Sequence, residues 1–455
     1  MKSPSKPLRV LAVAATAVAV TLTSGAGQAA ARPLAPSPSP SSPAVEIPDT
    51  PVGAQVRWLL DASTRTPIAE SELKEHLAAA FLQQVPPAQV NQVLASMADM
   101  RLQKIAGAQP TELVGEVTAG GKTYTLTISV DGAGKINSLR FSVPATPQPA
   151  PTSWQELDQR LRKVAPDVGF AAAEVTDDGR CRTVHAVSPG EPRPLGSMFK
   201  LYVLGTVAKQ VKQGTLDWDT ELTIKPELKS LPSGRLQDRP DNSKVSVLEA
   251  AKLMISISDN TGADLLLHAA GRRAVENTVR SWSAHAKRNV PFLSTRELFA
   301  LKGADYRRHA KRYLSLGTAQ RRAYLAKVVD KVPLTGIVPW TKPRELGTVE
   351  WFASPEDVCR VYAELSELRS KEVGQIMSAN GGGLGLSPGT WPTVWFKGGS
   401  EPGVLDLSYL ARTSSGRTFV VTTLASNPSA PFAEDQVVQE FLALSRGAFT
   451  LLGRS

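Results

Sequence analysis

The sequence predicts an α+β protein. A small N-terminal domain of three helices and an antiparallel sheet precedes a larger C-terminal domain, in which helices cover an antiparallel sheet and form an all-helical subdomain. Between residues 51 and 143, apolar residues first recur at helical spacing and then alternate. Strand patterns occur at both ends of residues 154–455 with helical patterns between them, so distant segments share one sheet. Two Pro-rich stretches separate these regions.

Length and composition limit the classes of protein. A chain of 455 residues exceeds one ordinary core, which indicates two or three domains. Hydrophobic residues make up 42% and charged residues 21%, a balance that excludes a disordered chain. The net charge of +10 favours anionic partners such as carboxylate ligands, cell-wall polymers or nucleic acid, without selecting among them.

Residues 1–31 have the pattern of a signal peptide. Lys2, Lys6 and Arg9 precede the apolar run 10–22, and the small residues 29–31 follow it. The run is shorter than the roughly 20 residues of a membrane-spanning helix, so we expect cleavage, export and no membrane span afterwards. An uncleaved anchor is the alternative.

A Pro/Ser-rich linker is expected over residues 32–50 and an α+β domain over residues 51–144. Three helical stripes precede strand patterns at 111–120, 122–131 and 135–143, and the turn 131–134 joins the last two. The pattern resembles the nuclear-transport-factor/ketosteroid-isomerase type, which implies a small cone-shaped domain. We find no catalytic cluster there and expect a structural or recognition module.

A second linker (145–153) precedes the C-terminal domain (154–455), which contains three short motifs. They are Ser197–Lys200 at the start of a helical run, Ser258–Asn260 after a helix, and Lys397–Gly399 at the end of a strand. The SxxK pattern alone is weak, because Ser3–Lys6 and Ser71–Lys74 also match it. The order, the context and the interval of 61 positions (258 − 197) strengthen the set.

These residue types suit acyl transfer. A serine hydroxyl needs a base to remove its proton, and Lys200 projects from the same helix face as Ser197. Desolvation and neighbouring cations can make the Lys200 amine neutral. The positive end of the helix dipole favours a nucleophile at its N-terminus. The backbone N–H groups of Ser197 and Ser400 would form an oxyanion hole, where one donor contributes about 3 kcal/mol.

Together the motifs resemble those of class A β-lactamases and penicillin-binding proteins. The resemblance implies that Ser197 is the nucleophile, that Ser258 relays a proton to the leaving group, and that Asn260 holds the substrate amide. It further implies that Lys397 attracts a substrate carboxylate. The substrate-binding set expected from the sequence is Asn260, Lys397, Gly399 and Ser400.

The sequence departs from that pattern at two points. Gly398 stands where the family usually has Thr or Ser, so a hydroxyl that commonly bonds the substrate carboxylate is missing. The family's acidic loop motif, which positions the deacylating water, has no clear counterpart. Glu297 is the nearest candidate for that base, and a structural ion pair is the alternative for it. Without such a base the acyl-enzyme would be long-lived.

Residues 51–455 also resemble a two-domain family that includes lipoproteins of acid-fast bacteria and a hydrolase from a clavam-biosynthesis gene cluster. The stretches HAVSPGEPRPLGSMFKLYVLG (185–205) and MISISDNTGADLLL (254–267) carry this resemblance. It implies a weak β-lactamase or esterase whose natural substrate is open.

The sequence therefore favours an exported serine hydrolase acting on a β-lactam, an ester or a D-alanyl amide. A non-turnover penicillin-binding or cell-wall sensor protein and an esterase with little β-lactamase activity are the alternatives. We expect a small-molecule or peptidoglycan-like substrate that carries a carboxylate, no nucleic-acid partner and no cofactor. We also expect no metal, because the five histidines are scattered.

Three features stay open. Cys181 and Cys359 are the only cysteines, and nothing in the sequence shows whether they pair. Residues 302–345 contain eleven Lys/Arg against three Asp/Glu, a net charge of +8. This segment is either a solvated helical face or a basic lid that guides an anionic substrate. The oligomeric state is also open.

Overall fold

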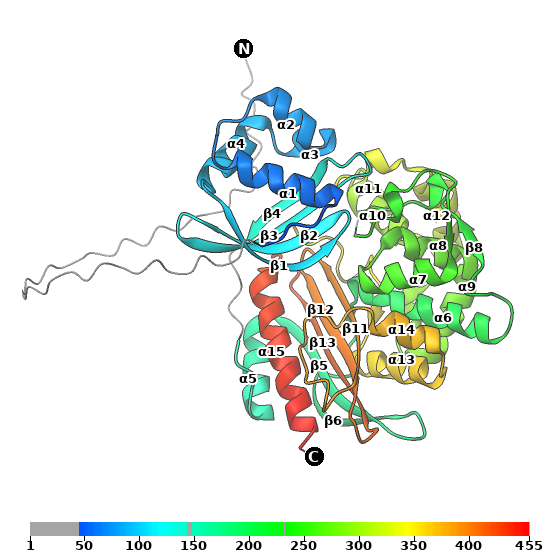
Figure 1. Cartoon of the computed structure of the whole chain (residues 1–455). Coiled ribbons are helices and arrows are strands. Elements are labelled where there is room, and N and C mark those ends of the chain that lie inside the picture. Colours follow the sequence, from blue (N-terminus) through cyan, green and yellow to red (C-terminus); the bar gives the residue numbers. More distant parts are fainter. Residues whose placement is uncertain (1–44, 143–147, 232, 455) are drawn as a thin grey trace, which may run out of the picture. The chain divides into compact units, whose positions relative to one another are not determined.

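The computed structural model describes residues 45–142, 148–231 and 233–454 (Figure 1). The expected signal peptide, most of the first linker and part of the second lie outside the described residues. Glu46–Ser455 group as one compact unit, so the domain boundary expected at 145–153 stays a prediction. Within the described residues, no helix has both the length and the apolar character needed to cross a membrane.

The N-terminal region begins with four helices where the sequence predicted three. They are α1 (Pro51–Ala62), α2 (Glu70–His76), α3 (Ala79–Gln84) and α4 (Pro87–Ser96). The second of the three expected helices is divided into α2 and α3, because Leu77 and Ala78 are extended. The Ala78 N–H donates to the carbonyl of Ile136. A sheet contact thus replaces a helical hydrogen bond.

Four antiparallel strands follow, in the order β1-β2-β3-β4. They are β1 (Arg101–Gln109), β2 (Glu112–Ala119), β3 (Lys122–Val130) and β4 (Ile136–Ser142). The sequence did not predict β1. Register shifts between Leu102 and Lys104 and between Ile105 and Gly107 break its alternation, because each extra residue turns the following side chains to the other face.

The C-terminal region contains a five-stranded antiparallel sheet in the order β11-β12-β13-β5-β6. The strands are β5 (Asp167–Val175), β6 (Cys181–Val187), β11 (Thr393–Glu401), β12 (Val404–Arg412) and β13 (Thr418–Ser426). Every residue of β13 is buried, which indicates that both faces of the sheet are covered. As the sequence predicted, the two ends of the region form one sheet, and the α+β class is confirmed.

Helices α5 (Trp154–Val164) and α15 (Glu434–Leu452) pack together on one face of this sheet (Figure 1). The remaining helices of this region contribute to a second hydrophobic core, separate from the one that α5 and α15 form with the sheet. They are α6 (Lys200–Lys212), α7 (Val247–Ser256), α8 (Asn260–Ala270), α9 (Arg272–Trp282), α10 (Thr295–Gly303), α11 (Arg308–Leu314), α12 (Thr318–Lys327), α13 (Pro355–Glu367) and α14 (Lys371–Ser378). Two-stranded pairs join β7 (Arg193–Pro194) to β10 (Phe352–Ala353), and β8 (Glu221–Thr223) to β9 (Lys244–Ser246).

A disulfide joins Cys181, at the start of β6, to Cys359 in α13. The bridge spans 178 residues of sequence and ties the edge of the sheet to a helix that covers it. This resolves the pairing that the sequence left open.

We expect the double variant Cys181→Ala/Cys359→Ala to lose about 2–4 kcal/mol of unfolding free energy, because the bridge restricts the unfolded chain. Urea unfolding of the variant and of the oxidised parent measures the difference. Equal unfolding midpoints and slopes would contradict the expectation.

Candidate active site

Ser197 lies in a short 3-10 turn, Gly196–Phe199, which leads directly into α6. Gly196 has a φ of +46°, a conformation that favours glycine. The turn places Ser197, half-buried, at the mouth of a cavity, with Lys200 as the first residue of α6.

The Ser258–Asn260 segment forms the tight connection between α7 and α8. Ser258 has a φ of +59°, which is costly for a non-glycine residue and is typical of functional sites. The buried Asp259 holds the connection. One of its carboxylate oxygens accepts from the Gly262 N–H and caps α8, and the other accepts from the N–H groups of Arg235 and Leu236.

Lys397 reaches the same place from strand β11 of the sheet. Its ammonium group is buried and donates to Ser258 Oγ at 3.1 Å and to the Gly398 carbonyl at 2.6 Å. The structure therefore brings together the three motifs from segments that are 61 and 139 residues apart.

Lys200 Nζ lies at the centre of this group. It lies 2.6 Å from the carbonyl oxygen of Ser258 and 2.6 Å from Asn260 Oδ1. It also lies 3.1 Å from Ser197 Oγ and 3.0 Å from Ser258 Oγ. A neutral amine has two N–H donors, which the carbonyl and amide oxygens can take up. Its lone pair is then left for the Ser197 hydroxyl proton.

The surroundings favour that neutral form. Burial, and then the positive charge of Lys397, hold the pKa of Lys200 well below its usual range. Burial also lowers the pKa of Lys397, to about 7. The site thus contains an amine suited to accept a proton and a second one that is partly protonated near neutral pH.

The strand β11 packs against the turn Gly196–Phe199 without intervening side chains. A Cβ built on Gly399 would lie 2.1 Å from the Leu195 carbonyl oxygen and 2.9 Å from the Ser197 nitrogen. A Cβ built on Gly196 would lie 2.9 Å from the Ser400 nitrogen. The two glycines therefore allow the Ser197 and Ser400 N–H groups to approach one another, as an oxyanion hole requires.

Steric crowding explains why position 398 is glycine and not Thr or Ser. A Cβ at this position would meet the Phe396 ring at 3.0 Å, the Asp406 carbonyl at 3.1 Å and Leu407 at 3.4 Å. Phe396, two residues earlier on the same strand face, leaves little room for a Thr or Ser. A carboxylate bound here would therefore rely on Lys397 and on backbone groups.

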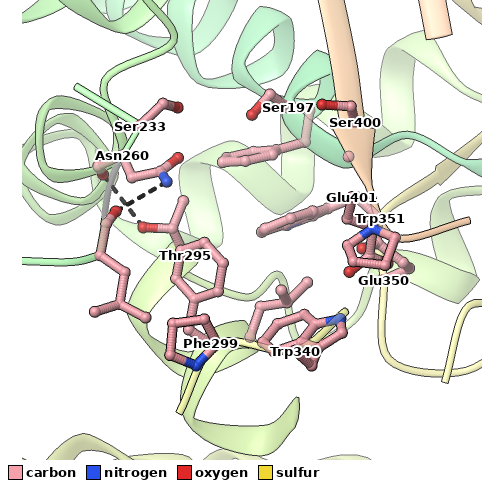
Figure 2. Close-up of a pocket in the computed structure, with 16 residues that line it drawn as sticks. Ser197, Ser233, Asn260, Thr295, Phe299, Trp340, Glu350, Trp351, Ser400 and Glu401 are labelled. Carbon is pink, nitrogen blue, oxygen red and sulfur yellow. Dashed lines mark hydrogen bonds between the residues drawn. The ribbon is translucent and has the colours of Figure 1, made fainter. Parts of the chain in front are cut away.

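Figure 2 shows the cavity beside Ser197, which has a volume of about 460 Å³. Ser197 and Ser400 lie next to each other, with Asn260 and Thr295 on one side and Trp340, Glu350 and Glu401 on another. Phe199, Phe299 and Trp351 supply aromatic walls. A second hollow of about 400 Å³ borders Ser197, Ser258, Lys397, Gly399 and Ser400.

Glu297 does not line either hollow. Its fully buried carboxylate accepts two hydrogen bonds from Arg272, at 2.7 and 2.8 Å, and one from the Ser294 N–H at 2.8 Å. It completes the capping box of α10. The structure thus corrects the assignment of Glu297 as the deacylating base and supports the alternative, a structural ion pair.

We expect Glu297→Gln to lower the unfolding free energy by about 3 kcal/mol, because Arg272 loses a buried charged partner. The rate at which a labelled enzyme loses its acyl group should stay within about twofold of the parent, since the carboxylate lies away from the cavity walls. Thermal unfolding and intact mass against time measure the two quantities. A long-lived adduct found only in the variant would restore the catalytic role.

Several residues of the cavity were not predicted. Ser233 donates to the Ser258 carbonyl at 2.8 Å, and Thr295 donates to Ser230 Oγ at 2.7 Å. Trp340 belongs to the basic segment 302–345, so this segment contributes to the cavity wall and not only to solvated helices. Among the described residues, no cluster of three or more His, Cys, Asp or Glu side chains could hold a metal ion.

Comparison with protein families gives two matches. Residues 153–328 match the model of the β-lactamase enzyme family, and residues 47–136 match the model of the N-terminal region of the ORF 12 gene product. The first match agrees with the β-lactamase resemblance of the motifs over residues 153–328, and residues 47–136 match a different model. A search of curated proteins gives no significant match.

Solved structures with a similar fold are β-lactamases and a protein named PBP-A. PBP-A is 18% identical, with 68% of this chain and 100% of that chain covered and a TM-score of 0.44. The β-lactamase from Sphaerobacter thermophilus is 17% identical (66% and 97% covered, TM-score 0.46). PenP, a putative class A β-lactamase from Rhodopseudomonas palustris, is 14% identical (66% and 98%, 0.45). These likenesses concern the fold alone.

Proposed function

We propose that this protein, whose C-terminal region has a β-lactamase-type fold, is a serine hydrolase that acylates Ser197 with a β-lactam, an ester or a D-alanyl amide. One observation carries the proposal. The buried Lys200 amine, with a lowered pKa, lies within hydrogen-bonding distance of both Ser197 Oγ and Ser258 Oγ. A buried lysine held between two serine hydroxyls is a base that can take a proton from one and pass it to the other.

Acylation follows from these positions. Lys200 takes the proton of the Ser197 hydroxyl as its oxygen attacks the substrate carbonyl. The N–H groups of Ser197 and Ser400 stabilise the negative oxygen of the tetrahedral intermediate. The proton then passes from Lys200 to Ser258 Oγ, whose own proton goes to the leaving nitrogen or oxygen. Lys397 contacts Ser258 Oγ and favours this transfer electrostatically.

The second hollow supports a substrate that carries a carboxylate. Lys397 and Ser400 both border it, together with Ser197. A carboxylate placed there would be attracted by the Lys397 ammonium while the scissile carbonyl lies over Ser197. Asn260 donates one amide hydrogen to the Leu231 carbonyl, so its other hydrogen can bind the substrate's amide oxygen.

Deacylation is expected to be slow. In the cavity beside Ser197 the carboxyl groups are those of Glu350 and Glu401, and both contact the Lys302 ammonium. The second hollow is lined by the buried Asp406, which accepts from the Ala425 N–H and whose pKa burial raises well above its usual range. Neither Glu350 nor Glu401 is an unpaired carboxylate, because one oxygen of each accepts from Lys302. This observation favours the second candidate, a penicillin-binding protein that holds its acyl group, over a hydrolase with rapid turnover.

We further propose that the protein works outside the cytoplasm. The signal-peptide pattern of residues 1–31 supports export, and the Cys181–Cys359 bridge is typical of oxidising compartments. The carboxylate-bearing substrates proposed above, including peptidoglycan-like peptides, would be met there.

The test is to incubate the purified protein with a fluorescent penicillin and with p-nitrophenyl acetate, and to follow intact mass and nitrophenol release. Turnover of either reporter supports a hydrolase. A stable adduct at Ser197 without turnover supports the penicillin-binding alternative. Neither adduct nor turnover would refute both.

The pH dependence of acylation should differ between charged and neutral substrates. Raising the pH deprotonates Lys397 above its pKa of about 7 and removes the charge that attracts a substrate carboxylate. We expect kcat/KM for a penicillin to fall about tenfold per pH unit above that value. A neutral ester lacks the carboxylate that this charge attracts, so its kcat/KM should fall much less there. Parallel profiles for the two substrates would contradict this assignment.

A further inference from the structure

A buried group of charges lies in the cavity wall away from the catalytic amines. Lys302, at the end of α10, donates to Glu350 at 3.1 Å and to Glu401 at 2.6 Å. The Lys302 and Glu350 side chains are fully buried, and that of Glu401 is 10% exposed. Both Glu350 oxygens have partners, because the second accepts from the Trp351 N–H at 3.0 Å.

Two buried polar atoms in this wall meet no hydrogen-bond partner among the described residues. Glu401 Oε2 receives no N–H or O–H donor, and the indole N–H of Trp340 finds no acceptor. Both residues line the cavity that contains Ser197, and Figure 2 shows them in the same part of it. Buried polar groups without partners are costly, so a bound group that donates to one of these atoms and accepts from the other would be stabilised here.

We propose that Glu401 and Trp340 together bind a neutral hydrogen-bonding group, a carboxamide or a hydroxyl, at the end of the substrate's acyl chain. This rests on the proposed function and names its substrate class. The N–H or O–H of the ligand donates to the Glu401 carboxyl, and its oxygen accepts from the Trp340 indole N–H. Phe199, Leu298 and Phe299 line the same cavity and suit an apolar chain between that group and the carbonyl at Ser197.

A neutral group fits better than an ammonium. The Arg344 guanidinium lies 5.7 Å and the Lys302 ammonium 5.9 Å from the centre of the Trp340 ring, so a further cation would be repelled. The indole N–H also presents positive charge to the ligand. Burial raises the pKa of Glu401 well above its usual range, against the opposing effect of Lys302, and the Glu350 carboxylate raises it further.

The test compares p-nitrophenyl esters whose acyl chains of two to six methylenes end in a carboxamide, in an isopropyl group of the same shape, or in an ammonium. The ratio of kcat/KM for carboxamide over isopropyl is the readout. We expect at least one chain length with a ratio of about ten in the parent. Glu401→Gln should keep the ratio above about three, because an amide can still donate and accept.

Two variants should lose that preference. Glu401→Leu removes the carboxyl group that would accept from the ligand. Trp340→Phe keeps an aromatic ring but removes the indole N–H. In each variant we expect the kcat/KM ratio of carboxamide over isopropyl to fall to about one to three. A ratio near one in the parent at every chain length overturns the inference. An ammonium ester preferred over both others, with the preference lost in Glu401→Gln, overturns the neutral assignment.

The failure of the inference is distinguishable from that of the proposed function. Acylation of the parent by p-nitrophenyl acetate tests the function alone. If that fails, binding of the unreactive N-methyl amides of the same acids, measured by calorimetry, still compares carboxamide with isopropyl ends. Tighter binding of the carboxamide ligand, weakened in Trp340→Phe, supports the inference without chemistry. Equal binding of the two refutes it.

Discussion

Ser197→Ala is expected to abolish acylation. The variant lacks the oxygen that forms the acyl bond, and the Lys200 amine and the oxyanion hole cannot replace it. Nitrophenol release should fall by a factor of about 10⁴ or more, as is typical when the nucleophile of a serine hydrolase is removed. Intact mass after incubation with a fluorescent penicillin should show no adduct.

The chain offers a matched control for this variant. Ser71–Lys74 has the same SxxK spacing as Ser197–Lys200, but Ser71 is an exposed residue of α2 in the N-terminal region. Ser71→Ala should therefore acylate like the parent. A penicillin adduct of undiminished yield in Ser197→Ala would show that another residue is the nucleophile.

The central residues of the site could be predicted because each motif is short. Ser197 and Lys200 share a helical turn, and Ser258 and Asn260 share one connection, so local spacing fixes their relative positions. The convergence of Lys397 with them depended on a resemblance to known enzymes, since 139 residues separate it from Ser258. The distances around Lys200 now give that convergence a geometric basis.

The remaining cavity could not be predicted, because its polar residues come from segments without a shared motif. Lys302 lies on α10, Glu350 precedes a short strand, and Glu401 ends β11. In sequence, Lys302 is one of eleven basic residues in its segment and Glu401 is an ordinary strand-end glutamate. Only tertiary packing shows that the Lys302 ammonium is buried between two carboxyl groups.

Glu297 illustrates the opposite error. Its type and its place after Ser258 suited a catalytic base, but the same Ser294–Glu297 spacing is a helix capping signal. The structure shows the capping box and the Arg272 pair. The local capping signal therefore accounts for this glutamate, and the structure places it away from the cavity walls.

Lys200→Met is expected to reduce the acylation rate by about 10³-fold, near the middle of the range for general-base catalysis. Methionine keeps an unbranched chain in this fully buried position but has no amine to take the Ser197 proton or to reach Ser258. Lys212→Met, at the exposed end of the same helix, is the matched control and should retain the parent rate. With neutral esters, the residual rate of Lys200→Met should no longer depend on pH through the titration of this amine. If the lysine had a purely structural role, its removal would leave the pH profile unchanged. Parent-like acylation in Lys200→Met, with an unchanged pH profile, would move the base to Lys397, the other buried amine that contacts Ser258.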